Sequence, residues 1–124
     1  MSTHRDILLV EDEAAIAELL RRVLVRAGYS VRIASDGIQA LAALAGDRPA
    51  LLILDLILPG MSGYTILEHL DQQQIAMPIV IITGNPLYHD SLHHAGIRHV
   101  LIKPFRIEEL LEALDTTTGF STTA

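Results

Sequence analysis

Polar side chains that could do chemistry follow directly after short apolar runs of the sequence. Asp55 ends the run LLILD, and Glu11 and Asp12 follow the run ILLV. Thr83 and Lys103 follow two later runs, IVII and VLI. Three carboxylates in one place would repel one another and raise each other's pKa values unless a cation neutralised them. Oxygen ligands of this kind favour Mg²⁺ or Mn²⁺, so these residues predict a divalent metal site wherever the chain brings them together.

The other two residues of this set suit a phosphate group. A lysine is a compact positive donor and a threonine hydroxyl is a neutral one. Lys103 is the only lysine of the chain, which otherwise uses arginine. Asp55 could then act as a nucleophile, because a metal offsets charge on an incoming phosphoryl group while the carboxylate attacks it. The chemistry predicted here is formation of an aspartyl phosphate.

Each of these residues also has an ordinary structural explanation. Asp55 could simply favour a turn at the end of a strand. Glu11, Asp12 and Glu13 could stabilise the N-terminus of a helix through its dipole. A threonine at a strand end, or one lysine at the surface, carries little information by itself. The agreement among the separate positions is what favours the functional interpretation.

The elements that must position these residues are short strands. Continuous apolar runs that are too short for a helix predict strands covered on both faces, as in a parallel sheet. The alternating stretch at residues 29–34 instead predicts a half-exposed edge strand, with Val31 and Ile33 on one side. The continuous runs span residues 7–10, 50–54, 79–82 and 100–102.

Between the strands, apolar residues recur at helical spacing. Gly28 ends the first of five expected helices, Ser35 and Asp36 are N-cap candidates for the second, and Asn85 and Pro86 begin the fourth. Strands alternating with helices predict one α/β domain with helices on both faces of the sheet. The expected buried faces are Ile16, Leu19, Leu20, Val23 and Leu24; Ile38, Leu41, Ala42 and Leu44; Ile66, Leu67 and Leu70; Leu87 and Leu92; and Ile107, Leu110, Leu111 and Leu114.

The composition limits the class of protein. Of the 124 residues, 50% are hydrophobic but only 4% are aromatic, which predicts a single domain with an aliphatic core. No apolar stretch reaches the about 18 residues of a membrane span, and the chain has no cysteine, so we expect a cytoplasmic protein. The net charge is -6 and the basic residues are scattered, which argues against direct binding of nucleic acid or membrane by this domain.

The motifs LLVEDE, LDLILPGMSG, IITG and LIKPF, in this order, resemble those of the receiver domains of two-component response regulators. The resemblance covers residues 6–115, leaving residues 1–5 as an N-terminal extension and residues 116–124 as a flexible tail or the start of a linker. It implies a flavodoxin-like (βα)5 doubly wound parallel sheet with strand order 2-1-3-4-5. It also implies a signalling switch, and not a turnover enzyme, that receives a phosphoryl group from a sensor histidine kinase or a phosphotransfer protein.

The resemblance also implies a role for each acid. Asp55 would be the phosphoacceptor. Asp12 and Asp55 would bind Mg²⁺ directly, Glu11 would act mainly through water, and the backbone carbonyl of Ile57 would complete the protein ligands. The domain would be a monomer or a homodimer that depends on phosphorylation, and it would act on an effector that the sequence does not identify.

Further roles fall on the phosphate side of the site. Thr83 and Lys103 would hold phosphoryl oxygens, helped by the amide of Gly84, and the bond between Lys103 and Pro104 would be cis. The chain departs from the family at Val100, where receivers usually carry a Tyr or Phe that moves together with the residue at the position of Thr83. The aromatic half of the conformational switch should therefore be absent or replaced.

Three other interpretations of the sequence stay open. A pseudo-receiver would keep the fold without using the acids, although such modules usually lose an acid or the lysine. An aspartate-nucleophile phosphatase usually has a second acid two residues after the nucleophile, where this chain has Ile57. A flavin-binding module would need a phosphate-binding loop rich in Gly, Ser and Thr after the first strand, and the sequence has none there.

The stretch HDSLH is a weak candidate for a metal site. His89 and His93 have the spacing of the two histidines in H-E-x-x-H zinc motifs, but an aspartate replaces the glutamate and no third ligand is evident. We expect a solvated histidine surface here, to which His94 and His99 would add.

Overall fold

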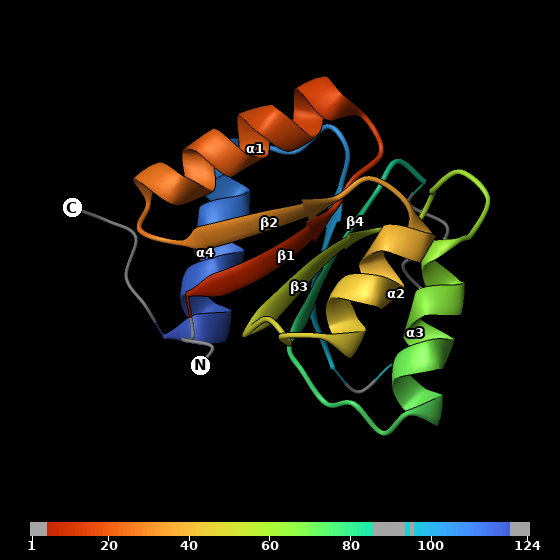
Figure 1. The fold of residues 1–124 in the computed structure, drawn as a ribbon. Coiled ribbons are helices and arrows are strands. Elements are labelled where there is room, and N and C mark those ends of the chain that lie inside the picture. The colour runs from red at the N-terminus through yellow and green to blue at the C-terminus, as the bar shows by residue number, and fades with distance from the viewer. Residues whose placement is uncertain (1–4, 86–93, 95, 120–124) are drawn as a thin grey trace.

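The computed structural model describes residues 5–85, 94 and 96–119, and these residues form a parallel sheet between two layers of helices (Figure 1). The helix expected to begin at Asn85 falls largely outside the described residues. The described elements, in chain order, are β1 (Asp6–Val10), α1 (Ala14–Arg26), β2 (Ser30–Ala34), α2 (Gly37–Ala45), β3 (Leu51–Asp55), α3 (Gly63–Gln72), β4 (Ile79–Thr83), β5 (Ile97–Ile102) and α4 (Ile107–Thr118).

The strand order is β2-β1-β3-β4-β5 and all neighbouring strands are parallel, which confirms the predicted doubly wound topology. After β2 the chain crosses back over β1 to form β3, so the order reverses between β1 and β3. Crevices at such reversal points are where open α/β sheets bind their ligands. The register pairs Val10 with Leu54, Asp55 with Ile82, and Thr83 with Ile102, which brings the ends of four strands to one edge.

The two faces of the sheet carry separate aliphatic layers. Helices α1 and α4 cover one face, and α2 and α3 cover the other (Figure 1). Neighbouring residues of a strand point into opposite layers, so Ile53 packs under α1 and α4 while Leu54 packs under α2 and α3. Every residue of β3 and β4 is buried, as their continuous apolar runs predict.

Three residues expected in buried helical faces lie on the surface. Leu19 is 56% exposed and Ile38 is 74% exposed, and Ala42 is exposed as well. Each helix buries a small residue against the sheet, Ala17 in α1 and Ala40 in α2, beside large ones. The buried residues of α1 are Ala17, Leu20 and Leu24, and those of α2 are Gly37, Ala40 and Leu44.

Two elements extend beyond their expected bounds. β5 begins at Ile97, before the apolar run that predicted it. Helix α4 continues to Thr118, so the expectation of a flexible tail is wrong at residues 116–118. Threonine is a weak helix former, but the hydroxyls of Thr117 and Thr118 donate to carbonyls one turn earlier, at 2.7 and 2.8 Å. The helix ends at Gly119, whose φ of 74° is the left-handed conformation that favours glycine at this position.

None of the helices in the described part of the chain has the length and apolar character that crossing a membrane requires.

The N-cap of α2 is Asp36, one of the two residues expected there. Its Oδ1 atom accepts a hydrogen bond from the backbone N–H of Gln39 at 2.8 Å. We expect Asp36→Ala to lower the free energy of unfolding by about 1 kcal/mol, because an N–H at the helix N-terminus loses its partner. Urea denaturation followed by circular dichroism measures this change. Asp47→Ala, which removes another acid near the end of α2, is the control, and equal stability of the two variants would contradict the assignment.

Candidate metal and phosphoryl site

The carboxylates of Glu11, Asp12 and Asp55 meet at the carboxyl ends of β1 and β3. One oxygen atom from each lies within 4.8 Å of the others. Glu11 is completely buried and Asp55 is 3% exposed, whereas Asp12 is exposed. The cluster therefore has a buried floor and one side that solvent, a metal ion or a phosphate can reach.

Both oxygens of Asp55 are held by neighbouring groups. Its Oδ1 atom accepts a hydrogen bond from the backbone N–H of Ile57 at 2.9 Å. Its Oδ2 atom accepts one from the Lys103 ammonium group, also at 2.9 Å. The rigid strand and these two donors fix the carboxylate in one orientation. The proposed role of the Ile57 carbonyl as a metal ligand stays a prediction.

Lys103 is the cation that faces the acids. Its Nζ atom lies 2.9 Å from Asp55 Oδ2 and 3.3 Å from Glu11 Oε1. Burial acts to lower the pKa of Lys103, but the hydrogen bonds and charges of Asp55 and Glu11 outweigh it and raise the pKa, so the lysine stays protonated. Its backbone N–H donates to the carbonyl of Thr83 at 2.8 Å, and the bond to Pro104 is cis, as expected.

One lysine does not balance the charge of this cluster. Burial, followed by the hydrogen bond with Asp55 and its charge, raises the pKa of Glu11 to about 8, although Lys103 acts in the opposite direction. The three carboxylates therefore place more negative charge in this partly buried site than one lysine offsets. A divalent cation among the three carboxylates would offset their mutual repulsion. An all-oxygen donor set suits Mg²⁺. The residues present thus fit the metal that the sequence predicted.

The residues expected on the phosphate side lie at the ends of the neighbouring strands. Thr83 is fully buried at the end of β4, and its Oγ1 atom accepts a hydrogen bond from the N–H of Asn85 at 3.2 Å. Gly84 is exposed, and a side chain there would meet no atom within 4 Å. Val100 is partly buried against the layer under α2 and α3. Thr83 and Lys103 thus lie at the same end of the sheet as Asp55.

The structure has an apolar groove beside the acids that the sequence did not predict. It has a volume of about 370 Å³ and lies between α1 and the chain that follows β5. Leu19, which we expected in the core, forms part of its wall together with Ile16 and Phe105, and Lys103 stands at its edge. The only available signal was that α1 carries more large apolar residues than one buried face needs.

One residue of the expected histidine surface, His94, is buried instead. His89 and His93 lie outside the described residues. The side chain of His94 is only 8% exposed and lies 3.0 Å from a carboxylate oxygen of Asp71. His99 Nε2 is 2.8 Å from Thr116 Oγ1. His94 is therefore a packed residue, and the sequence pattern did not reveal this.

Comparison with protein families places this geometry in a known group. A family model described as the response regulator receiver domain matches residues 7–115. Among curated proteins, the response regulator MprA of Mycobacterium avium (strain 104) is 39% identical over 107 residues, which are 85% of this chain and 47% of that protein. MprA of Mycobacterium tuberculosis (strain H37Rv) is also 39% identical, over 46% of its length. The chain thus spans about half the length of the curated relatives it matches.

Solved structures agree with the sequence matches. Response regulator TrrA from Thermotoga maritima, solved in complex with Mg(2+)-BeF, is 30% identical with a TM-score of 0.81, and the match covers 90% of this chain and 96% of that one. Chemotaxis response regulator CheY4 of Vibrio cholerae is also 30% identical with a TM-score of 0.81, covering 93% of this chain and 99% of that one. The fold is therefore similar to the folds of these proteins.

Proposed function

The chain belongs to the family of response regulator receiver domains, and we propose that Asp55 accepts a phosphoryl group from a sensor histidine kinase or a phosphotransfer protein in the cytoplasm. The assignment of Asp55 as the phosphoacceptor rests on one observation. Asp55 is buried at the switch point of the sheet, 2.9 Å from the Lys103 ammonium group, with carboxylate oxygens of Glu11 and Asp12 within 4.8 Å. This arrangement combines a fixed nucleophile, a metal donor set and a positive charge.

The chemical step follows from these positions. A carboxylate oxygen of Asp55 attacks the phosphorus of the donor, forming an O–P bond while the P–N bond to the donor nitrogen breaks. The electron pair of that bond leaves with the nitrogen, which takes up a proton. The Lys103 ammonium offsets negative charge on the phosphoryl oxygens, and the Thr83 hydroxyl offers them a neutral donor. Mg²⁺ bound by Asp12 and Asp55 would neutralise further charge in this step.

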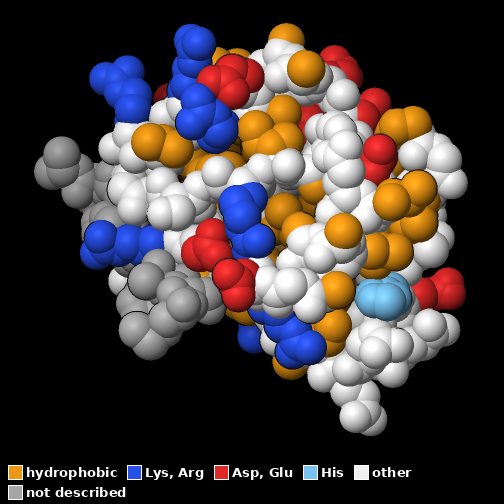
Figure 2. Space-filling view, viewed as in Figure 1, with side chains coloured by type: hydrophobic (Ala, Val, Ile, Leu, Met, Phe, Trp, Pro, Cys, Tyr) orange, Lys and Arg blue, Asp and Glu red, His pale blue; other side chains and the backbone are white. Residues whose placement is uncertain are grey.

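Surfaces on both sides of the acids favour a protein as the phosphodonor. The groove with Ile16, Leu19 and Phe105 lies on one side. Ile38 in α2 and Ile57 in the segment after β3 lie on the other side, and they are 74% and 55% exposed. Exposed apolar residues around a site are typical of surfaces that bind another protein. On the face that Figure 2 shows, basic side chains lie among acidic and apolar ones and form no continuous stripe, which supports a protein partner over nucleic acid.

The proposal is tested by incubating the protein with Mg²⁺ and phosphoramidate and measuring its intact mass. We expect the addition of one phosphoryl group, its removal by hydroxylamine as for an acyl phosphate, and no addition when EDTA replaces Mg²⁺. An unmodified mass with saturating Mg²⁺ would contradict the proposal and favour a module that keeps the fold without the chemistry.

We propose a switch and not a turnover enzyme, because the position two residues after the nucleophile holds Ile57. An apolar side chain cannot protonate a leaving group. Steady hydrolysis of p-nitrophenyl phosphate, at a rate that Asp55→Asn abolishes, would overturn this part of the proposal.

The hydroxyl of Thr83 should couple phosphorylation to conformation. It is buried at the end of β4, the strand next to the one that carries Asp55, and Val100 provides no aromatic ring to move with it. We expect Thr83→Ala to leave phosphorylation of Asp55 intact but to reduce the amide shift changes that phosphorylation causes at residues 84, 85 and 96–102. Two-dimensional NMR measures these changes, with Thr65→Ala as the control. Shift changes of the wild-type size in Thr83→Ala would contradict this role.

A further inference from the structure

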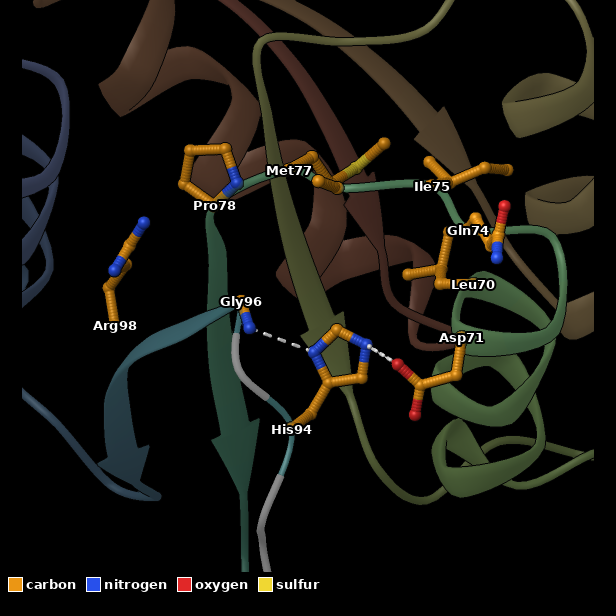
Figure 3. Close-up of a pocket in the computed structure, with 10 residues that line it drawn as sticks. Leu70, Asp71, Gln74, Ile75, Met77, Pro78, His94, Gly96 and Arg98 are labelled. Carbon is orange, nitrogen blue, oxygen red and sulfur yellow. Dashed lines mark hydrogen bonds and ion pairs between the residues drawn. The ribbon is translucent and has the colours of Figure 1, made fainter.

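A cavity of about 480 Å³ lies where β4 and β5 begin, at the opposite ends of the strands from the acidic site. Figure 3 shows the residues that line it. It is bounded by the end of α3, the connection to β4 and the beginning of β5. Leu70, Ile75, Met77 and Pro78 provide an apolar wall, and polar side chains stand around it. Small-molecule sites commonly have this size and this combination of an apolar lining with a few polar groups. Since β4 begins here and ends at Thr83, the cavity is separate from the acidic site.

His94 places a buried hydrogen-bond donor in the wall of this cavity. Its Nδ1 atom accepts a hydrogen bond from the backbone N–H of Gly96 at 3.0 Å, so the proton of the neutral ring is on Nε2. Nε2 lies 3.0 Å from Asp71 Oδ1, which is an ion-pair distance. Nevertheless, within the described residues this buried atom makes no hydrogen bond of good geometry. A buried donor of this kind calls for an acceptor from a ligand or from water.

Arg98 places a positive charge at the mouth of the same cavity. Its side chain is exposed, and no residue among 5–85, 94 and 96–119 pairs with its guanidinium group. Figure 3 shows Arg98 and Asp71 on opposite sides of His94, so the two charges lie at different ends of the lining. An unpaired guanidinium is suited to a carboxylate, which it can hold with two parallel hydrogen bonds.

We propose that the cavity binds a small monocarboxylate with an apolar body and one neutral oxygen acceptor. The carboxylate pairs with Arg98, the apolar body packs on Leu70, Ile75 and Met77, and the neutral oxygen accepts from His94 Nε2. The charge of Asp71 beside Nε2 repels a second negative group there, which is why the acceptor near His94 is neutral. N-acylated apolar amino acids and apolar oxo acids have this chemistry.

The test is an amide NMR titration of the full chain with three matched probes, without Mg²⁺ or phosphodonor. N-acetyl-L-leucine has all three features, N-acetyl-L-leucinamide lacks the carboxylate, and 4-methylpentanoate lacks the acetamido oxygen. We expect saturable shifts at residues 74–78 and 96–98 for N-acetyl-L-leucine, a shift of the His94 side-chain nitrogens, and roughly tenfold weaker binding of the amide, about the size of one charge-assisted hydrogen bond. Binding of 4-methylpentanoate should be weaker and should leave the His94 nitrogens unshifted.

Arg98→Gln provides the decisive variant because Arg98 is exposed and its replacement does not disturb the core. We expect this variant to bind N-acetyl-L-leucine and its amide equally well, whereas the control Arg48→Gln keeps the roughly tenfold difference. The proposal is overturned if no probe gives saturable shifts, which would mean that water alone meets the buried donor. It is also overturned if the acid and the amide bind alike in the wild type. Neither result bears on phosphorylation of Asp55.

Discussion

Asp55→Asn is expected to abolish phosphorylation of the chain by phosphoramidate in the presence of Mg²⁺. An amide oxygen is a much weaker nucleophile than a carboxylate, and the substitution also removes a charged ligand from the metal donor set. The shape of the side chain is unchanged, so its oxygen can still accept a hydrogen bond from Ile57 or Lys103. The loss should therefore reflect chemistry and not a failure to fold.

The measurement is the intact mass after incubation of the variant beside the wild type, with circular dichroism to confirm that both are folded. Asp47→Asn removes an acid from an exposed position away from the cluster and should be modified like the wild type. Removal of the charge at Asp55 also removes one cause of the raised pKa of Glu11. Modification of this variant to the wild-type extent would show that another residue is the acceptor.

The acidic site was predictable from the sequence because of a property of parallel sheets. Residues that follow the strands of such a sheet arrive at the same edge, so polar residues after apolar runs must converge. The pattern therefore predicts that Asp55, Glu11 and Lys103 lie close together, and the distances of 2.9 and 3.3 Å from Lys103 Nζ to the two carboxylates confirm this. This prediction requires only that the strands be identified, and it does not require knowledge of side-chain packing.

Features that depend on packing between elements were not predictable in this way. The helical spacing of apolar residues predicts that Leu19 and Ile38 are buried, but both are exposed. The spacing does not show which side of a wide apolar stripe faces the sheet. In α2, Gly37, Ala40 and Leu44 take the buried positions and leave Ile38 exposed. His94 is buried with contacts to Asp71 and Gly96, and nothing in its local sequence distinguishes it from a surface histidine.

The strand end that carries Asp55 depends on a glycine at the start of α3. The backbone N–H of Gly63 donates to the carbonyl of Leu56 at 2.8 Å, which seats the helix directly against the chain that leaves β3. A Cβ atom at Gly63 would lie 2.8 Å from Leu56 Cα and 2.9 Å from the carbonyl oxygen of Asp55. These are backbone atoms and cannot rotate away, so an alanine here must push the helix off the loop that follows the nucleophile.

Gly63→Ala is therefore expected to lower the free energy of unfolding by about 1–3 kcal/mol, the usual cost of extra volume in a packed region. Because the displaced loop donates the Ile57 N–H to Asp55, the variant should also accept a phosphoryl group more slowly than the wild type. Urea denaturation measures the first effect and the time course of intact mass measures the second. Gly84→Ala is the matched control, since a Cβ atom there meets nothing within 4 Å and the backbone amide is retained. If Gly63→Ala were as stable as Gly84→Ala, the close contact between α3 and the end of β3 could not be what holds Asp55 in place.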